Sequence, residues 1–243
     1  MHAPPADSRA DVEAEGLDAG PLEPIVAGVA HEFGNILAVI TNYASLASRR
    51  VEDPTTAELL DKVRIASRRA ARLNRQLHDL GECGTLAVQP VVVNDLVRDA
   101  RPLLAEGLRE GCHLHLDLGE EPLEAQANRA GLEMALRHLL DNACDALPDG
   151  GTITIGARPL AGTAADPGVE ISVSDQGVGM GPDALAQALE PRYSTQPKGQ
   201  TSGLGLTIVD RVVRSLGGRV RLESEEGSGT TVRLQLAGVS AGG

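Results

Sequence analysis

Aromatic residues are almost absent from this sequence, which contains one Phe, two Tyr and no Trp among 243 residues. A hydrophobic core must therefore consist of Leu, Val, Ile and Ala, a composition that suits aliphatic helix packing. The shortage also leaves almost nothing on which nucleic-acid bases could stack, and stacking on aromatic side chains is how many proteins hold single strands. Single-stranded nucleic acid is thus a poor candidate for a partner.

Positive charge is scarce as well, because 22 Lys and Arg stand against 34 Asp and Glu, a formal net charge of −12. Binding to phosphate backbones or anionic membranes needs clustered basic residues, so we expect neither nucleic-acid binding nor direct membrane contact. One basic strip stands out at helical spacing, and it consists of Arg64, Arg68, Arg69 and Arg72. This strip is either a solvated helix face or a docking surface for an acidic partner.

Cysteine is limited to Cys83, Cys112 and Cys144, and no two of them form a C-x-x-C pair. An odd number without paired spacing predicts reduced thiols and no zinc site. No segment approaches the roughly 18 apolar residues of a membrane span, and the N-terminus lacks the pattern of a signal peptide. We therefore expect a cytoplasmic chain, and a membrane sensor, if one exists, would lie outside this sequence.

Composition divides the chain into four segments. Residues 1–20 are rich in Ala, Pro, Gly and acidic residues and predict a flexible acidic tail, and residues 239–243 predict a flexible C-terminus. Between them, residues 21–83 have the apolar period of helices, and residues 84–238 mix helical and strand patterns. The predicted boundary between the two folded domains lies near Gly81 to Leu86.

The first folded segment predicts two long helices joined by a short turn. Apolar stripes extend over residues 22–50 and 56–80, with Asp53 and Pro54 between them. Proline is tolerated in the first turn of a helix but not in its interior, so the pattern predicts an antiparallel hairpin that ends at Gly81. One hairpin has little core of its own, and a dimeric four-helix bundle formed by two copies would bury both stripes.

The second folded segment predicts an α/β sandwich with a mixed sheet, which makes the chain α+β as a whole. Its periodicity predicts helices at 94–110, 129–146 and 205–216 and strands at 113–118, 152–157, 169–174, 219–224 and 230–236. Gly227-Ser228-Gly229 separates the last two strands and predicts a closing hairpin.

His31 is the first candidate for chemistry. At about 100° per residue it lies opposite the apolar stripe of its helix, and Asn35 shares that outer face four residues later. A neutral imidazole is a good nucleophile near pH 7, and the neighbouring carboxylate of Glu32 could take its proton. Taken alone, the same pattern also fits a surface histidine with no role.

The string Val-Ala-His-Glu-Phe-Gly-Asn at residues 29–35 resembles the H-box of sensor histidine kinases. In that family a helical hairpin is the dimerisation and phosphotransfer domain. The resemblance implies that His31 carries the phosphoryl group and that Glu32 acts as general base. It also implies that Asn35 helps to position water when the same protein dephosphorylates its partner.

Three segments of the second domain could together form a nucleotide pocket. Asn142, on the apolar helix, offers an amide oxygen to a magnesium ion. Asp175 stands at the end of a strand and could accept a hydrogen bond from an exocyclic amine, while Gly177 and Gly179 allow the backbone to approach a flat ring. Backbone N–H groups where the next helix begins suit a phosphate. These groups belong to Gly203, Leu204 and Gly205.

In chain order, and after the H-box string, these three segments resemble the N, G1 and G2 boxes of the GHKL, or Bergerat-fold, ATP-binding domain, and residues 190–195, which precede the last of them, resemble its F box. Histidine kinases share that domain with type II topoisomerases, Hsp90 chaperones and MutL. The resemblance extends from about Leu22 to Leu236 and implies binding of ATP and Mg²⁺, with the metal on Asn142 and the adenine amine on Asp175. It implies an ATP-dependent protein histidine kinase that passes phosphoryl groups from His31 to an aspartate of a response-regulator receiver domain.

Three positions depart from the family pattern. His138 stands where the N-box usually has a further Asn, and it could face the phosphates of a bound nucleotide or serve only in helix packing. Arg192 replaces an F-box aromatic, and Gln196 stands where relatives often carry a Lys that Lys198 could replace. These changes leave open a receiver-docking scaffold or pseudokinase with weak ATP turnover. An ATPase of the chaperone or topoisomerase kind is a third alternative, but it would need a catalytic Glu where His138 stands.

Overall fold

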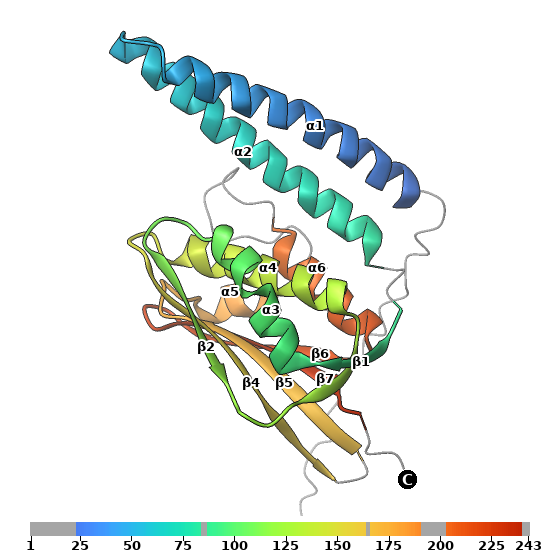
Figure 1. The fold of residues 1–243 in the computed structure, drawn as a ribbon. Helices are drawn as coiled ribbons and strands as arrows, with labels where there is room; N and C mark the ends of the chain where they lie inside the picture. The colour runs from blue at the N-terminus through green and yellow to red at the C-terminus, as the bar shows by residue number, and fades with distance from the viewer. Residues whose placement is uncertain (1–22, 84–86, 164–165, 191–202, 240–243) are drawn as a thin grey trace, which may run out of the picture.

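The structure is a computed structural model that describes residues 23–83, 87–163, 166–190 and 203–239 (Figure 1). Within these ranges it describes the side chains of all residues except 23–29, 31, 32, 161–163, 166 and 167. Among the described helices, none combines the length and the apolar character that a membrane crossing requires.

The first two helices form the predicted hairpin, with α1 spanning Glu23–Ser48 and α2 spanning Pro54–Glu82. Asp53 caps α2, because its Oδ2 accepts the backbone N–H of Thr56 at 2.9 Å. Pro54 takes the first helical position, where a missing N–H breaks no helical hydrogen bond. The predicted end at Gly81 is wrong. Glycine ends a helix by adopting the left-handed conformation, whereas here the helix continues to a right-handed C-cap at Cys83, with φ −59° and ψ −23°.

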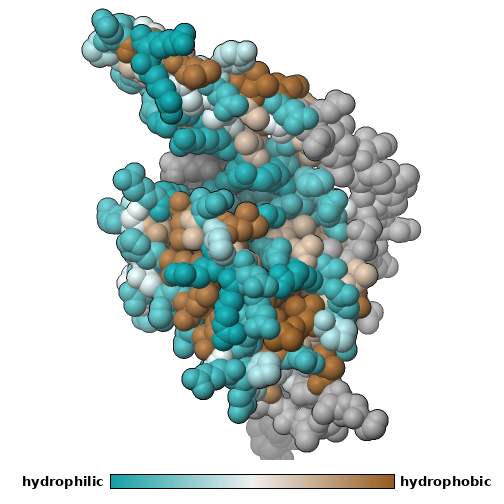
Figure 2. Space-filling model, in the orientation of Figure 1, coloured by the Kyte–Doolittle hydropathy of each residue, from teal (hydrophilic) through white to brown (hydrophobic). Residues whose placement is uncertain are grey.

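α1 and α2 contact each other through small side chains. Ala30 and Ala44 are buried, and the Nδ2 of Asn74 donates a hydrogen bond to the carbonyl oxygen of Ala30. Large apolar side chains remain exposed on both helices, and they include Phe33, Ile36, Ile40, Tyr43, Leu59, Val63, Leu73 and Leu77. Figure 2 shows apolar surface on this hairpin. A single copy of the hairpin therefore leaves most of its large apolar side chains in solvent.

The second domain contains a five-stranded sheet of order β2-β4-β5-β7-β6. Its strands are β2 (Cys112–Leu118), β4 (Gly151–Thr163), β5 (Asp166–Asp175), β6 (Arg219–Glu225) and β7 (Gly229–Ala237). β2 pairs with β4 in parallel, and the other neighbours are antiparallel, which confirms the predicted mixed sheet. The helices α3 (Val93–Glu106), α4 (Arg129–Ala146) and α6 (Gly205–Ser215) cover one face of this sheet (Figure 1).

Three short elements were not predicted. β1 (Gln89–Val92) and β3 (Glu124–Ala127) form a separate antiparallel pair, and α5 (Pro182–Gln187) follows the end of β5. Four to six residues are too few to establish a strand or helix period, so these segments carry no clear signal in the sequence. α3 also ends at Glu106, earlier than predicted, because Gly107 takes the C-cap position.

α4 lies at the centre of the second domain. Leu132, Leu136 and Leu139 are almost completely buried and pack in the same core as Ile153 and Ile171 of the sheet. Burying a leucine side chain contributes roughly 1.5–3 kcal/mol, so α4 is held firmly on the sheet. Its opposite face is left for contacts with the hairpin.

The three cysteines are all buried free thiols. Burial raises the pKa of Cys144 to about 11. At neutral pH this side chain is therefore a protonated, poorly nucleophilic thiol.

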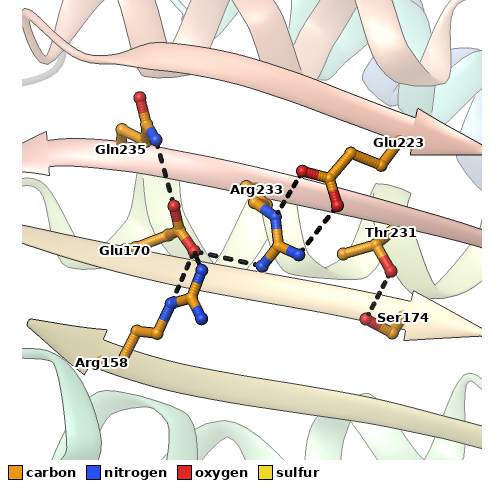
Figure 3. A network of polar contacts seen from close by, with 7 residues as sticks. All are labelled: Arg158, Glu170, Ser174, Glu223, Thr231, Arg233 and Gln235. Atoms are coloured by element: carbon orange, nitrogen blue, oxygen red, sulfur yellow. Dashed lines mark hydrogen bonds and ion pairs between the residues drawn. The ribbon is translucent and has the colours of Figure 1, made fainter. Parts of the chain in front are cut away.

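Glu170 of β5 forms a polar network with β4 and β7 (Figure 3). Its carboxylate is 3% exposed and accepts hydrogen bonds from Arg158 at 2.9 Å, Gln235 at 3.0 Å and Arg233 at 3.2 Å. Arg233 also pairs with the exposed Glu223 at 2.9 Å. Burial alone would raise the pKa of Glu170, but the hydrogen bonds and the two arginine charges outweigh it and lower that pKa. The network thus ties three neighbouring strands together through one buried charge.

We expect Glu170→Gln to lower the free energy of unfolding at pH 7 by about 1–3 kcal/mol, because the arginines lose a charged acceptor. A lowered folded-state pKa gives stability that is present above the unfolded pKa, about 4.3, and is lost as the pH falls through the folded pKa. Urea denaturation of wild type and variant should therefore converge below about pH 4. Glu223→Gln, which removes an exposed partner of Arg233, is the control and should have a smaller effect. An E170Q difference that stays constant from pH 7 to pH 3 would contradict this account.

Candidate functional site

A cavity of about 760 Å³ lies between α2 and the second domain. One wall is a single face of α2, and the other walls come from α4, the end of β5, the loop after it, the start of α6 and β7. α2 is the hairpin helix that faces α4 and α6 (Figure 1). The cavity is therefore shared between the two domains.

Arg72 of α2 joins the domains by ion pairs to α4. Its Nε lies 3.3 Å from Oδ2 of Asp141, and its Nη2 lies 2.9 Å from Oδ2 of Asp145. Burial acts against the arginine charge, but the charges of the two aspartates and the hydrogen bond to Asp145 outweigh it and raise the pKa of Arg72. Arg109 reaches the second carboxylate oxygen of Asp145 and completes this charged cluster.

A second contact between α2 and α4 involves His138. Its Nε2 lies 2.8 Å from Oδ2 of Asp79, and both side chains are buried. Arg137 lies 3.7 Å from the same carboxylate oxygen. In this arrangement His138 belongs to the contact between the domains, one turn before Asn142, and it is not among the described residues that line the cavity.

Asn142 lines the cavity beside the start of α6. A Cβ added to Gly205 would lie 2.9 Å from the Oδ1 of Asn142, so the glycine allows the helix start to approach the amide closely. Gly203 lines the same region with a positive φ of 67°. The structure thus brings together Asn142, Gly203 and Gly205, which are distant in the sequence.

The first turn of α6 opens toward this cavity, where Gly205 and Leu206 form part of the wall. Leu204 occupies the N-cap position, and its apolar side chain cannot cap the helix. Backbone N–H groups of a helix start attract anions, with help from the helix dipole. The α6 start is therefore suited to a phosphate group.

Asp175 also lines the cavity and is the last residue of β5. Its Oδ1 accepts the backbone N–H of Gly177 at 2.9 Å. Burial is the largest influence on the pKa of this carboxyl and raises it above its usual value, although hydrogen bonds to Gly177 and Thr230 oppose that change. A partly buried carboxyl with a raised pKa that lines a cavity is a typical ligand-binding group.

Gly177 and Gly179 hold the loop after β5 close to its neighbours. A Cβ on Gly177 would overlap the carbonyl oxygen of Ala146, and a Cβ on Gly179 would overlap that of Glu225. Gly179 also has a positive φ of 62°. Other side chains would displace this loop, which forms the cavity wall at Val178 and Met180.

His31, Glu32 and Asn35 all lie on α1. The side chain of Asn35 is exposed. Figure 1 shows α2 between α1 and the second domain, and no described residue that lines the cavity belongs to α1. Arg192, Gln196 and Lys198 lie outside the described residues.

The contribution of α2 to the site was not predicted. Arg72 was assigned only to a basic strip, and Asp79 was not singled out. The sequence does hold one indication of this contact. Asp141 and Asp145 are four residues apart on α4, so both can pair with one arginine. Sequence alone does not say which of several arginines they meet.

Two protein families match the chain. The family "His Kinase A (phospho-acceptor) domain" matches residues 23–82. The family "Histidine kinase-, DNA gyrase B-, and HSP90-like ATPase" matches residues 127–238.

Curated relatives cover most of the chain. Sensor kinase CckA of Brucella abortus is 31% identical over 226 residues, which are 87% of this chain and 24% of that protein. Sensor histidine kinase ZraS of Escherichia coli is 32% identical over 219 residues, which are 88% of this chain and 45% of that protein. The chain thus spans less than half the length of these relatives.

Solved structures share the fold. Full-length ShkA in complex with AMPPNP superposes with a TM-score of 0.66 at 23% identity, covering 91% of this chain and 47% of that one. The mycobacterial sensor histidine kinase MprB superposes with a TM-score of 0.53 at 24% identity, covering 63% of this chain and 99% of that one.

We expect Arg72→Gln to loosen the contact between α2 and α4, because Asp141 and Asp145 lose their shared cation. Breaking a partly buried ion pair of this kind costs about 1–3 kcal/mol. Hydrogen exchange should therefore speed up in residues 66–79 of α2 and in the exposed turns of α4. Arg75→Gln removes an exposed arginine of the same helix and is the control. Equal exchange rates in both variants would show that the Arg72 contact does not hold the domains together.

Proposed function

Because this chain belongs to the sensor histidine kinases of two-component systems, we propose that it phosphorylates its own His31 with ATP. We further propose that it transfers this phosphoryl group to an aspartate of a response-regulator receiver domain. The observation that carries the proposal is that one chain combines a phospho-acceptor hairpin, with His31 on α1, and a cavity that joins Asn142, Asp175 and the start of α6.

ATP fits the cavity in size and chemistry. A volume of about 760 Å³ is within the range of pockets for small molecules and cofactors. We propose that Asp175 accepts the adenine amine, with Gly177 and Gly179 shaping the wall beside the ring. The phosphates would then lie at the start of α6. The N–H groups there belong to Gly203, Leu204 and Gly205.

Magnesium fits beside Asn142, whose amide oxygen is a hard ligand of the kind that Mg²⁺ prefers. Among the described residues there is no group of three or more His, Cys, Asp or Glu that could hold a metal. This agrees with an ion held by one protein oxygen, nucleotide phosphates and water. When bound, Mg²⁺ neutralises phosphate charge. We propose that His138, one turn before Asn142, takes part in nucleotide binding only indirectly, because its contact with Asp79 positions α4.

The transfer to His31 is an in-line displacement. A ring nitrogen of His31 attacks the γ-phosphorus, and the bond from that phosphorus to the β–γ bridging oxygen breaks. ADP leaves with the electron pair, and the imidazole proton passes to Glu32. Holding the two reacting groups in line supplies much of the rate. For the opposing activity, dephosphorylation of the receiver, we propose that Asn35 positions the water that hydrolyses the receiver's acyl phosphate.

Transfer requires the second domain to move. In the described arrangement the cavity faces α2, whereas His31 lies on α1. The ion pairs of Arg72 and the contact between Asp79 and His138 must therefore open before the γ-phosphate meets His31. We interpret the described arrangement as the state in which nucleotide is held but not transferred.

We propose that two copies form a homodimer through the hairpin. Phe33 and Tyr43 of α1 are 56% and 68% exposed, and Leu59 of α2 is 57% exposed. Exposed large apolar side chains in a stripe on two helices favour a four-helix bundle.

The domain division we propose is residues 21–83 for dimerisation and phosphotransfer and residues 84–238 for ATP binding. Such a kinase would act in the cytoplasm, where ATP and receiver domains occur.

Autophosphorylation tests the proposal directly. With γ-labelled ATP and Mg²⁺, wild type should take up an acid-labile, alkali-stable label, and His31→Gln should take up none. Asn35→Ala is the matched variant on the same helix face and should still be labelled. If wild type binds ATP but stays unlabelled, a receiver-docking scaffold or pseudokinase replaces the kinase as the best reading.

Asp175→Asn should weaken ATP binding by roughly tenfold or more, because an amide cannot replace the charged acceptor. The substitution should not lower the free energy of unfolding at pH 7. A carboxyl whose pKa is raised in the folded protein lowers the free energy of unfolding at pH 7, and this penalty fades as the pH falls through the raised pKa. We therefore expect D175N to unfold at the same temperature as wild type or higher at pH 7. Calorimetric titration with ATP and a thermal melt check both parts, and a lower melting temperature would contradict the second.

A further inference from the structure

The described cations that line the cavity come from the hairpin. Among the described residues of the second domain that form its walls, the charged ones are Asp145 and Asp175, both acidic. Every basic lining residue in the described part of the chain lies on α2, and these are Lys62, Arg69 and Arg72. A nucleotide triphosphate would thus meet positive side chains only on the α2 side of the described walls.

These three cations differ in how strongly they are paired with carboxylates of the protein. Arg72 is held by Asp141 and Asp145. Lys62 pairs with Glu58 at 2.8 Å, but both side chains are about two-thirds exposed, at 67% and 68%, and such a pair contributes little. Arg69 is exposed, and no ion pair holds it among the residues that the structure describes. Arg69 is therefore the lining cation that is most available to a ligand.

Arg69 also lies on the face of α2 that lines the cavity. It precedes Arg72 by three residues, so the two side chains share a face of α2. Arg72 contacts Asp141, the neighbour of Asn142 on α4. α2 also packs against α6, whose first turn opens into the cavity. Lys62 lies two helical turns before Arg69 on the same face.

We propose that Arg69, assisted by Lys62, binds the terminal phosphates of the nucleotide while the second domain is docked on α2. The inference rests on the proposed ATP binding and extends it, because it assigns phosphate recognition to the helix of the phosphotransfer domain. A guanidinium is well suited to this role, since it can donate two hydrogen bonds to one phosphate. The nucleotide then bridges the domains, and the basic strip on α2 is in part a ligand-binding surface.

The test compares nucleotides that differ only in phosphate number. Calorimetric titrations of the full chain with ATP, ADP and adenosine, in the presence of Mg²⁺, would use wild type, Arg69→Gln, Arg69→Lys and Arg68→Gln. Arg68 is the matched control, because it is an exposed arginine beside Arg69 that is not among the described lining residues. We expect R69Q to weaken ATP binding by about fivefold to tenfold, to weaken ADP binding less and to leave adenosine binding unchanged. R69K should recover part of the loss.

The outcomes separate this inference from the proposed function. If wild type binds none of the three ligands, the proposed ATP site is wrong. If wild type binds ATP and R69Q binds it as tightly as R68Q does, ATP binding stands and the role of Arg69 is overturned. An equal loss for ATP and adenosine in R69Q would also overturn that role, because it would indicate a change of cavity shape and not a lost phosphate contact.

Discussion

Arg72 holds two carboxylates of another domain, and the arrangement of the chain depends on this contact. Its partners Asp141 and Asp145 lie one turn apart on α4, and His138 meets Asp79 one turn earlier. The hairpin is thereby fastened along two turns of the same helix. Since the opposite face of α4 is buried in the core of the sheet domain, one helix links the core, the cavity wall and the position of the hairpin.

The distribution of charge follows from the same contact. The protein carries a net charge of −12, and the described cavity walls of the second domain supply carboxylates and backbone N–H groups. Docking on α2 adds basic side chains to that cavity. An acidic protein can hold an anionic ligand in this way, because local charge and not the total charge decides attraction at short range. The same docking keeps the cavity away from α1, so in our proposal nucleotide binding and phosphoryl transfer belong to different arrangements.

Strongly periodic segments were predictable, and contacts between distant segments were not. α4 was predicted with its observed bounds, because 18 residues of helical period leave little room for another reading. Asn142 and the glycines at 203 and 205 were grouped because a family resemblance links their order, and in the structure they line one cavity. β1, β3 and α5 were missed because they are short. The pairing of Arg72 with Asp141, and of Asp79 with His138, has no local signal: each depends on how two domains meet, and several arginines on α2 could satisfy the same acids.

α2 is continuous from Pro54 to Glu82, with proline only at its first position. Its 29 residues span about 43 Å at 1.5 Å per residue. A helix of this length without a break behaves as a stiff rod, and torque applied at one end reaches the other. A small rotation of α2 about its own axis would change the direction of the lining side chains and of the exposed apolar stripe together. Such a rotation would also move Arg72 and Asp79 against their partners on α4, so the hairpin and the second domain are mechanically coupled.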